Sequence, residues 1–305
     1  MTIPDFANYG IDSHWINPEP PRRTLLVVYA HPDDESFGNA GTIIHYTAQG
    51  AAVHYACATR GESGTVAPEK MRGYADVGAL RTDEMLCAAK ALDLTGLHFL
   101  GYRDSGMVGT PENDHPDALV QADPDRVAGQ VTALIRALQP QVVLTFGPYG
   151  GYGHPDHIAM HHAATRAFRE AADPTCFPEQ LASGLSPWQP SKLYYPTFRT
   201  LTLKIGIRLM RLRGMDPSRL GENKDIDLVR AARETTPITT TVNSQEHLAA
   251  KERAWACHAS QNSARGPFQR LPGVLRSRFF ANEHFTRIVP EWHGGPREQD
   301  LFTGI

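Results

Sequence analysis

The stretch TLLVVYAHPDDE, which runs from Thr24 to Glu35, joins a run of apolar and β-branched residues to a cluster of polar ones. The apolar part, Thr24–Ala30, predicts a buried strand, because it is short, continuous and bounded by proline-rich sequence before and a turn after. The polar part then places His31, Asp33 and Asp34 at the carboxyl end of that strand. Ligands bind beyond such ends in parallel α/β sheets. The stretch therefore predicts an α/β fold and also a site.

The alternation of strand and helix continues along the chain. Further strands are predicted at 51–59, 98–101 and 141–146, and helices at 39–49, 77–92, 124–138 and 155–171. This order is typical of βαβ units, and it predicts a Rossmann-like, doubly wound, mainly parallel sheet with helices on both faces. We expect one domain, 1–305, with a catalytic core at 22–172. Residues 173–305 are expected to form a C-terminal extension that shapes the substrate cleft.

The pattern loosens beyond residue 172. Residues 174–196 carry several prolines and are predicted to be a linker or surface loop. The mixed basic and apolar segment 201–220 predicts an amphipathic helix with solvated arginines, with a membrane or partner surface as the alternative. A strand is predicted at 238–242 and a helix at 245–259.

The bulk composition narrows the class of protein. A net charge of -3 gives no basic face for nucleic acid. The first 21 residues lack a basic segment followed by an apolar one, which argues against a secretory signal, and no apolar run reaches the roughly 18 residues that span a bilayer. Four cysteines lie far apart, which favours a reducing compartment over a disulfide framework. We predict a soluble cytoplasmic protein with no nucleic-acid or membrane partner, and leave a homo-oligomer open.

A second polar motif, GHPDH at Gly153–His157, follows the predicted strand 141–146 and a glycine-rich segment. A histidine and an aspartate three residues apart on a tight turn, such as His31 and Asp34, can bind one divalent ion. A third ligand then comes from another loop, and zinc in hydrolases usually keeps an open position for water. Asp33 is left to act as a general base.

Each of these residues has an alternative interpretation. Asp33 or Asp34 can simply cap the following helix. His161 lies four residues after His157 and makes an alternative ligand pair, although His161 and His162 are expected on the helix surface. His115 repeats the His-Pro-Asp triplet but follows no predicted strand, so it is interpreted as a turn residue.

Together the two motifs resemble those of the zinc-dependent deacetylases of the PIG-L/LmbE-like family, which act on N-acetylglucosaminyl compounds. The resemblance extends through GESG at 61–64 and RDSGM at 103–107. It covers residues 25–168 well and the C-terminal third weakly. RDSGM and GYGHPDH look especially like the branch that acts on precursors of low-molecular-weight thiols, the N-acetylglucosaminyl-inositol and -malate deacetylases.

The resemblance implies a role for each site residue. His31, Asp34 and His157 would bind zinc, and the same donors would accept Fe²⁺ or Co²⁺. Asp33 would be the general base. The remaining assignments are a cation at His154 for the oxyanion or the leaving amine, a contact of Tyr152 with the carbonyl oxygen, and substrate contacts at Arg81, Asp104 and Glu62.

These roles predict a hydrolase that removes acetyl from an N-acetylglucosaminyl conjugate by attack of metal-activated water, giving acetate and a free amino sugar. The nearest alternative is an amidase that cleaves a thiol conjugate of such a sugar. A lysine after the first motif would support that amidase, but Ser36, Phe37 and Gly38 stand there. A non-catalytic metal-binding module is the other alternative, and the spare carboxylate of Asp33 argues against it. The rest of the substrate, whether inositol, malate, a lipid or another sugar, is left open.

Overall fold

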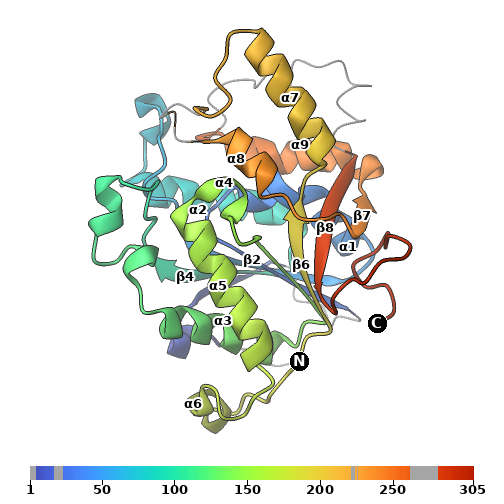
Figure 1. Ribbon diagram of the computed structural model, residues 1–305. Coiled ribbons are helices and arrows are strands. Elements are labelled where there is room, and N and C mark those ends of the chain that lie inside the picture. The colour runs from blue at the N-terminus through green and yellow to red at the C-terminus, as the bar shows by residue number, and fades with distance from the viewer. Residues whose placement is uncertain (1–4, 17–22, 221–223, 225, 262–280) are drawn as a thin grey trace.

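The computed structural model describes residues 5–16, 23–220, 224, 226–261 and 281–305, and these form one twisted sheet with helices packed around it (Figure 1). The strands of this sheet are β1 (Asp12–Trp15), β2 (Thr24–Tyr29), β3 (Ala52–Thr59), β4 (Gly96–Tyr102), β5 (Val142–Thr145), β6 (Lys192–Thr197), β7 (Thr240–Asn243) and β8 (Asn282–Val289). The helices are α1 (Ala40–Ala48), α2 (Val77–Ala91), α3 (Pro124–Leu138), α4 (Gly150–Gly153), α5 (Pro155–Glu170), α6 (Pro178–Ala182), α7 (Thr200–Leu212), α8 (Leu228–Arg233) and α9 (Leu248–Cys257). None of the described helices is both long and apolar enough to cross a bilayer.

The order of strands is β1-β4-β3-β2-β5-β6-β8-β7. The central five, from β4 to β6, are parallel, and antiparallel pairing adds β1 at one edge and β8 and β7 at the other. The predicted mainly parallel, Rossmann-like α/β fold is confirmed. The chain reverses its direction of winding between β2 and β5, and a doubly wound sheet binds its ligands beyond the carboxyl ends of the strands at this switch point.

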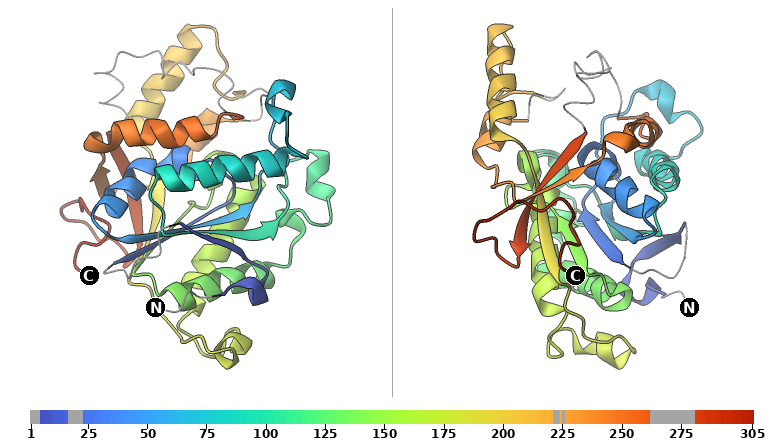
Figure 2. Two further views of the ribbon diagram at one scale, coloured as in Figure 1. Left: turned by 180° about the vertical axis from the view of Figure 1, so that it is seen from behind. Right: turned by 90° about the vertical axis from the view of Figure 1, so that its right-hand side faces the viewer.

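Helices cover both faces of the sheet. Figure 2 shows α3 and α5 on one face and α1, α2 and α9 on the other. All six residues of β2 are buried, as are all eight of β3. A strand covered on both faces is apolar throughout, and this explains why TLLVVY is a continuous apolar run and not an alternating one.

Two predictions for the C-terminal third need correction. Residues 174–196 are not a linker, because they contain α6 and the start of β6, which pairs with β5 in the middle of the sheet. The helix predicted at 201–220 ends at Leu212 as α7. It exposes Leu201, Ile205 and Leu212 as well as its arginines, so its outer surface is more apolar than a solvated basic face.

The sequence favoured a reducing compartment over a disulfide framework, and it gave no sign that one pair of cysteines is bonded. Cys87 of α2 and Cys257 at the end of α9 form a disulfide, whereas Cys57 and Cys176 are free. The two bonded cysteines are 170 residues apart in the sequence, so their spacing gave no sign of the pairing. The disulfide ties the C-terminal helix α9 to the core.

We expect Cys87→Ser to lower the free energy of unfolding by about 2–4 kcal/mol, because a crosslink across a long loop restricts the unfolded chain. Urea unfolding without reductant measures the loss, and reductant should lower the wild-type protein to the same value. Cys176→Ser, at a free cysteine, is the matched control and should change little. Equal stability of Cys87→Ser and wild type without reductant would contradict the crosslink.

Candidate active site

All nine predicted site residues lie at or beside the carboxyl edge of the parallel strands. They lie on the loops that follow β2, β3 and β4, on the helix α2, and on and between the helices α4 and α5 that follow β5. The loop after β2 carries the first motif, and a single π-helical turn at Glu35–Asn39 leads from it into α1. The loops after β3 and β4 carry Glu62 and Asp104, and the second motif lies after β5, where α4 ends and α5 begins.

Three of these residues meet at one point. His31 Nδ1 lies 3.1 Å from His157 Nε2. The carboxylate of Asp34 lies against both rings, with Oδ2 3.5 Å from His31 Nδ1 and Oδ1 3.2 Å from His157 Nε2. Ligand atoms bound at 2.0–2.1 Å in a tetrahedral zinc site are separated by roughly 3.4 Å, so these three donors have the spacing of metal ligands.

The opposite ring nitrogens decide the tautomers. His157 Nδ1 lies 2.9 Å from the carbonyl oxygen of Gly150, which can only accept, so this nitrogen carries the proton. His31 Nε2 lies 3.1 Å from Oδ2 of the fully buried Asp156 and donates to it. When both rings are neutral, Nδ1 of His31 and Nε2 of His157 therefore present lone pairs to each other. Two lone pairs and a carboxylate at this distance repel one another unless a proton or a metal ion lies between them, and these donors therefore fit a divalent metal.

The charge around His31 supports the same conclusion. Burial lowers the pKa of an imidazole, but the carboxylates of Asp104, Asp156 and Asp34 outweigh it and raise the pKa of His31 well above its ordinary value. The site therefore attracts positive charge.

Asp33 lies outside this cluster and has an unusual backbone conformation. Its φ is +118°, in a region that costs a non-glycine residue about 1–3 kcal/mol. The surrounding protein holds it: its N–H donates to Glu35 Oε2 at 2.9 Å, and its Oδ2 accepts from Arg81 Nη2 at 3.0 Å. Burial raises the pKa of Asp33 to about 6. The guanidinium of Arg81 lowers this pKa, and the negative charge of Asp34 raises it further. A carboxylate with a pKa near neutrality is suited to general-base chemistry.

Arg81 is buried beneath the first motif. Only 3% of it is exposed, and its guanidinium also donates to the carbonyl oxygens of Pro32 and, at 3.0 Å, Gly61. Its contact with the substrate stays a prediction, while its contact with Asp33 is direct.

Gly61 makes room for Arg81, and this has a testable consequence. A Cβ at Gly61 would lie 2.0 Å from Arg81 Nη1, so we expect Gly61→Ala to displace the guanidinium from Asp33 and to lower kcat about 10-fold or more. Gly50→Ala is the control: Gly50 also has a positive φ, but a Cβ there meets no described atom within 4 Å. Both variants should lose stability in urea unfolding through the positive φ, and Gly61→Ala should lose more because it also disturbs the buried guanidinium. Equal kcat values for the two variants would contradict the assignment.

His154 begins α5 and caps it. Its Nδ1 accepts a hydrogen bond from the N–H of Asp156 at 3.2 Å, so its Nε2 carries the proton. Burial and the neighbouring rings of His31 and His157 lower the pKa of His154 to about 2. These surroundings favour a neutral imidazole over the cation that the resemblance implied. Ring nitrogens of His31, His154 and His157 lie within 4.8 Å of one another and form a second candidate set, but the carboxylate of Asp34 contacts both His31 and His157 and supplies charge, which favours the predicted set.

The other predicted contacts surround the same cluster. The ring of Tyr152 lies 5.0 Å from that of His157. Asp104 Oδ1 lies 3.5 Å from His31 Nε2, and the N–H of Asp104 donates to Glu62 Oε2 at 3.0 Å. Glu62 and Asp104 thus support each other beside the candidate metal site, and their contacts with a substrate stay predictions.

Two histidines outside the cluster were also considered in the sequence. His161 is buried and not on the helix surface as predicted, and its Nδ1 donates to the carbonyl oxygen of Phe146 at 2.9 Å. His115 follows a short 3₁₀ helix at Pro111–Asp114, in agreement with its interpretation as a turn residue.

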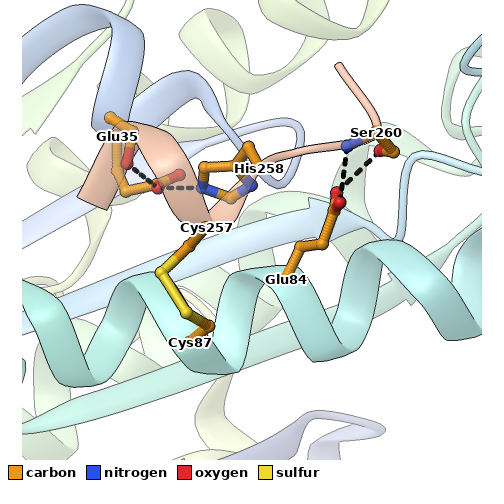
Figure 3. Close-up of a disulfide and its surroundings, with 7 residues drawn as sticks. Glu35, Glu84, Cys87, Cys257, His258 and Ser260 are labelled. Carbon is orange, nitrogen blue, oxygen red and sulfur yellow. Dashed lines mark hydrogen bonds and ion pairs between the residues drawn. A yellow bond between two sulfur atoms is a disulfide. The ribbon is translucent and has the colours of Figure 1, made fainter. Parts of the chain in front are cut away.

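Sequence reasoning missed the residues that lie behind the first motif. Glu35 and His258 are both fully buried, and their side chains meet at 2.6 Å (Figure 3). Burial lowers the pKa of His258, but the carboxylate of Glu35 outweighs it and raises the pKa above its ordinary value. Glu35 is the last residue of the first motif, so the sequence pointed to it. His258 lies 223 residues further along, and no pattern around it indicated that it contacts Glu35.

A Rossmann-like sheet with a His/His/Asp cluster and a separate carboxylate at its switch point defines a class of proteins with a candidate divalent-metal site.

Comparison with known proteins makes this assignment more specific. The family model described as PIG-L, GlcNAc-PI de-N-acetylase, matches residues 26–168. The chain is 37% identical over 294 residues to the 1D-myo-inositol 2-acetamido-2-deoxy-alpha-D-glucopyranoside deacetylase of Streptomyces avermitilis, and the alignment covers 93% of this chain and 98% of that protein. A protein of the same name from Streptomyces scabiei is 36% identical, with 92% and 89% covered. The chain belongs to the PIG-L family of de-N-acetylases, and the predicted resemblance is confirmed.

Solved structures agree on the fold. The N,N'-diacetylchitobiose deacetylase of Pyrococcus horikoshii is similar with a TM-score of 0.61 and 19% identity, over 87% of this chain and 84% of that one. The 4-carboxy-2-hydroxymuconate hydratase GalB of Pseudomonas putida is similar with a TM-score of 0.56 and 21% identity, over 90% and 99%. Because a deacetylase and a hydratase share this fold, the reaction has to be argued from the site.

Proposed function

We propose that this protein is a zinc-dependent N-deacetylase that releases acetate from an N-acetylglucosaminyl conjugate, with inositol as the other half of the substrate. The observation that carries the proposal is the pair of facing ring nitrogens of His31 and His157 beside the carboxylate of Asp34, with Asp33 as a separate carboxylate. The choice of inositol is supported by the relatives from Streptomyces, whose printed name is that of an inositol glycoside deacetylase.

His31, Asp34 and His157 would hold the metal. A bound zinc ion supplies a Lewis acid for the amide carbonyl and makes a water acidic enough to react at neutral pH, and Fe²⁺ or Co²⁺ would suit the same donors. Asp156, which accepts from His31, fixes that ring with its Nδ1 toward the site. A closed four-ligand structural site would need no additional carboxylate, and Asp33 therefore favours an enzyme.

Asp33 takes the proton from the attacking water and then delivers it to the amide nitrogen, which leaves as the free amine when the C–N bond breaks. Its contact with Arg81 keeps the carboxylate ionised and fixes its direction. Neutral His154 donates its Nε2 proton in a hydrogen bond to the developing oxyanion, and Tyr152 donates its hydroxyl to the same oxygen. Asp104 and Glu62 accept hydrogen bonds from the sugar hydroxyls.

We further propose that residues 1–305 act as one domain, in which 22–172 supply the catalytic groups and the C-terminal part shapes the cleft. Strands β6, β7 and β8 belong to the same sheet as the catalytic core, and this supports the proposal. The cytoplasmic location and a homo-oligomer stay predictions.

The test is to load the protein with Zn²⁺, Fe²⁺ or Co²⁺ and to measure the primary amine released from N-acetylglucosaminyl-inositol, N-acetylglucosaminyl-malate and N-acetylglucosamine. We expect the fastest release from the inositol conjugate. Faster release from the malate conjugate would contradict the choice of inositol. No release from any of the three, with metal bound, would contradict the deacetylase itself. A thiol conjugate of the same sugar, included in parallel, tests the amidase alternative.

A further inference from the structure

A short C-terminal segment, Cys257–Ser260, passes directly behind the first motif. It places the imidazole of His258 against the carboxylate of Glu35, and neither residue has measurable exposure to solvent (Figure 3). His258 Nε2 donates to Glu35 Oε1 at 2.6 Å, and the hydroxyl of Ser36 donates to the same oxygen at 2.6 Å. One oxygen of Glu35 is therefore held by two donors.

The other oxygen of Glu35 reaches the proposed general base. Glu35 Oε2 accepts the backbone N–H of Asp33 at 2.9 Å. The carbonyl oxygen of Asp33 accepts from the N–H groups of Ser36 and Phe37 at 3.0 and 2.9 Å. The backbone on both sides of Asp33 is thus fixed at the position where its φ is +118°. A residue in this region needs external contacts to keep its conformation.

The segment that carries His258 is itself anchored twice to α2. The backbone N–H and the hydroxyl of Ser260 donate to the two carboxylate oxygens of Glu84 at 2.6 and 2.7 Å. On the other side of His258, Cys257 is bonded to Cys87. Helix α2 also carries Arg81, which contacts Asp33 directly. The same helix therefore supports Asp33 by two routes, one through Arg81 and one through His258 and Glu35.

We infer that Glu35 and His258 are positioning residues: the buried His258–Glu35 pair holds the backbone of Asp33 so that its carboxylate points at the reacting water. The inference rests on the proposed function, in which Asp33 is the base. It gives the C-terminal third a part in the chemistry although His258 lies behind the site and not in it.

The test compares three variants at position 258. His258→Leu removes the donor, His258→Gln places an amide nitrogen near the position of Nε2, and His258→Asn has the same amide group with a shorter reach. We expect Leu and Asn to lower kcat about 10–100-fold, because a displacement of about 1 Å at a reacting group costs this much. KM should change little, because the contacts with the bound sugar are unaltered. Gln should restore kcat to within a few-fold of wild type, and metal content should be unchanged in all three variants.

Ser260→Ala is the matched structural control. It removes the hydroxyl contact with Glu84 but keeps the backbone N–H contact and the Cys87–Cys257 disulfide, so the segment stays anchored, and we expect a lower melting temperature and a kcat within about 2-fold of wild type. Equal kcat values for the Gln and Asn variants would overturn the inference, and so would a loss of kcat in Ser260→Ala as large as that in His258→Leu. The comparison of Gln with Asn remains decisive if the Leu variant does not fold.

Hydrogen exchange separates this inference from the proposed function. The N–H of Asp33 should exchange faster in His258→Asn than in wild type and in Ser260→Ala, whatever the enzyme acts on. Unchanged protection of Asp33 would overturn the positioning role even in an active enzyme. The metal-loaded wild type could release no amine while the protection of Asp33 is lost only in His258→Asn. That result would contradict the deacetylase but would support the positioning contact.

Discussion

Asp33→Asn is expected to keep its metal and to lose about 10²–10⁴-fold in kcat, the range that a general base contributes. Asparagine has nearly the same shape as aspartate and can still accept from Arg81 through its amide oxygen. It cannot take a proton from water at neutral pH. Asp33 also lies outside the cluster formed by His31, Asp34 and His157, so its replacement leaves the three donors in place.

The measurement pairs metal content with steady-state kinetics on the best substrate of the amine-release assay. Asp34→Asn is the matched control, because the same chemical change one residue further along removes charge from the metal cluster and should release the metal. If Asp33→Asn loses its metal while Asp34→Asn retains it, the roles of the two aspartates have been exchanged. A wild-type rate for Asp33→Asn would exclude Asp33 as the base.

The position of the site could be predicted from the sequence because each motif follows a buried strand. Strands β2 and β5 are short apolar runs, and a parallel sheet brings their carboxyl ends to one edge. It follows that His31 and His157, which are 126 residues apart, meet in the structure at 3.1 Å. Local patterning and a topological rule were enough for this part of the site.

The support behind the site could not be predicted in the same way. The contact of His258 with Glu35 spans 223 residues, and it depends on how α9 packs against α2. A single histidine at the end of a helix has no local pattern that reveals its partner. The buried Asp156 was visible in the second motif, where the sequence allowed it either to orient a histidine or to cap its helix, and its contact with His31 Nε2 agrees with the first role.

The C-terminal strands show a second limit of local patterning. Strand β8 pairs antiparallel with β6 and was not predicted, because its burial alternates only in part and its partner lies about 90 residues earlier in the chain. Glu298 is another long-range anchor: it accepts from Lys192 at 2.8 Å, across 106 residues. Strands β6, β7 and β8, which lie in the segments predicted to be a linker and a C-terminal extension, are therefore part of the central sheet.

His157→Ala is expected to lower metal affinity by more than about 100-fold, because loss of even an outer partner of a metal ligand costs about 10–100-fold. The imidazole is one of the three proposed donors, and its Nδ1 is already fixed by the carbonyl oxygen of Gly150, so no rearrangement of the ring is needed for binding. Alanine leaves His31 and Asp34 as two donors on one loop, which is one fewer than catalytic zinc sites use. Deacetylation should fall to background at any metal concentration that leaves wild type saturated.

Two further variants show how large this loss of metal affinity is compared with weaker changes at the same site. Asp156→Asn removes the charge that orients His31 and should weaken metal binding about 10–100-fold, less than His157→Ala does. His161→Ala removes a buried imidazole one turn further along α5, where it contacts the carbonyl oxygen of Phe146 and no member of the cluster, so it should lower stability and leave metal affinity unchanged. Competition with a chromophoric chelator gives the three affinities, and urea unfolding gives the stabilities. Loss of metal in His161→Ala with retention in His157→Ala would show that the second motif binds through its later histidine, and equal losses in both would mean that the helix, and not the ligand, had been disturbed.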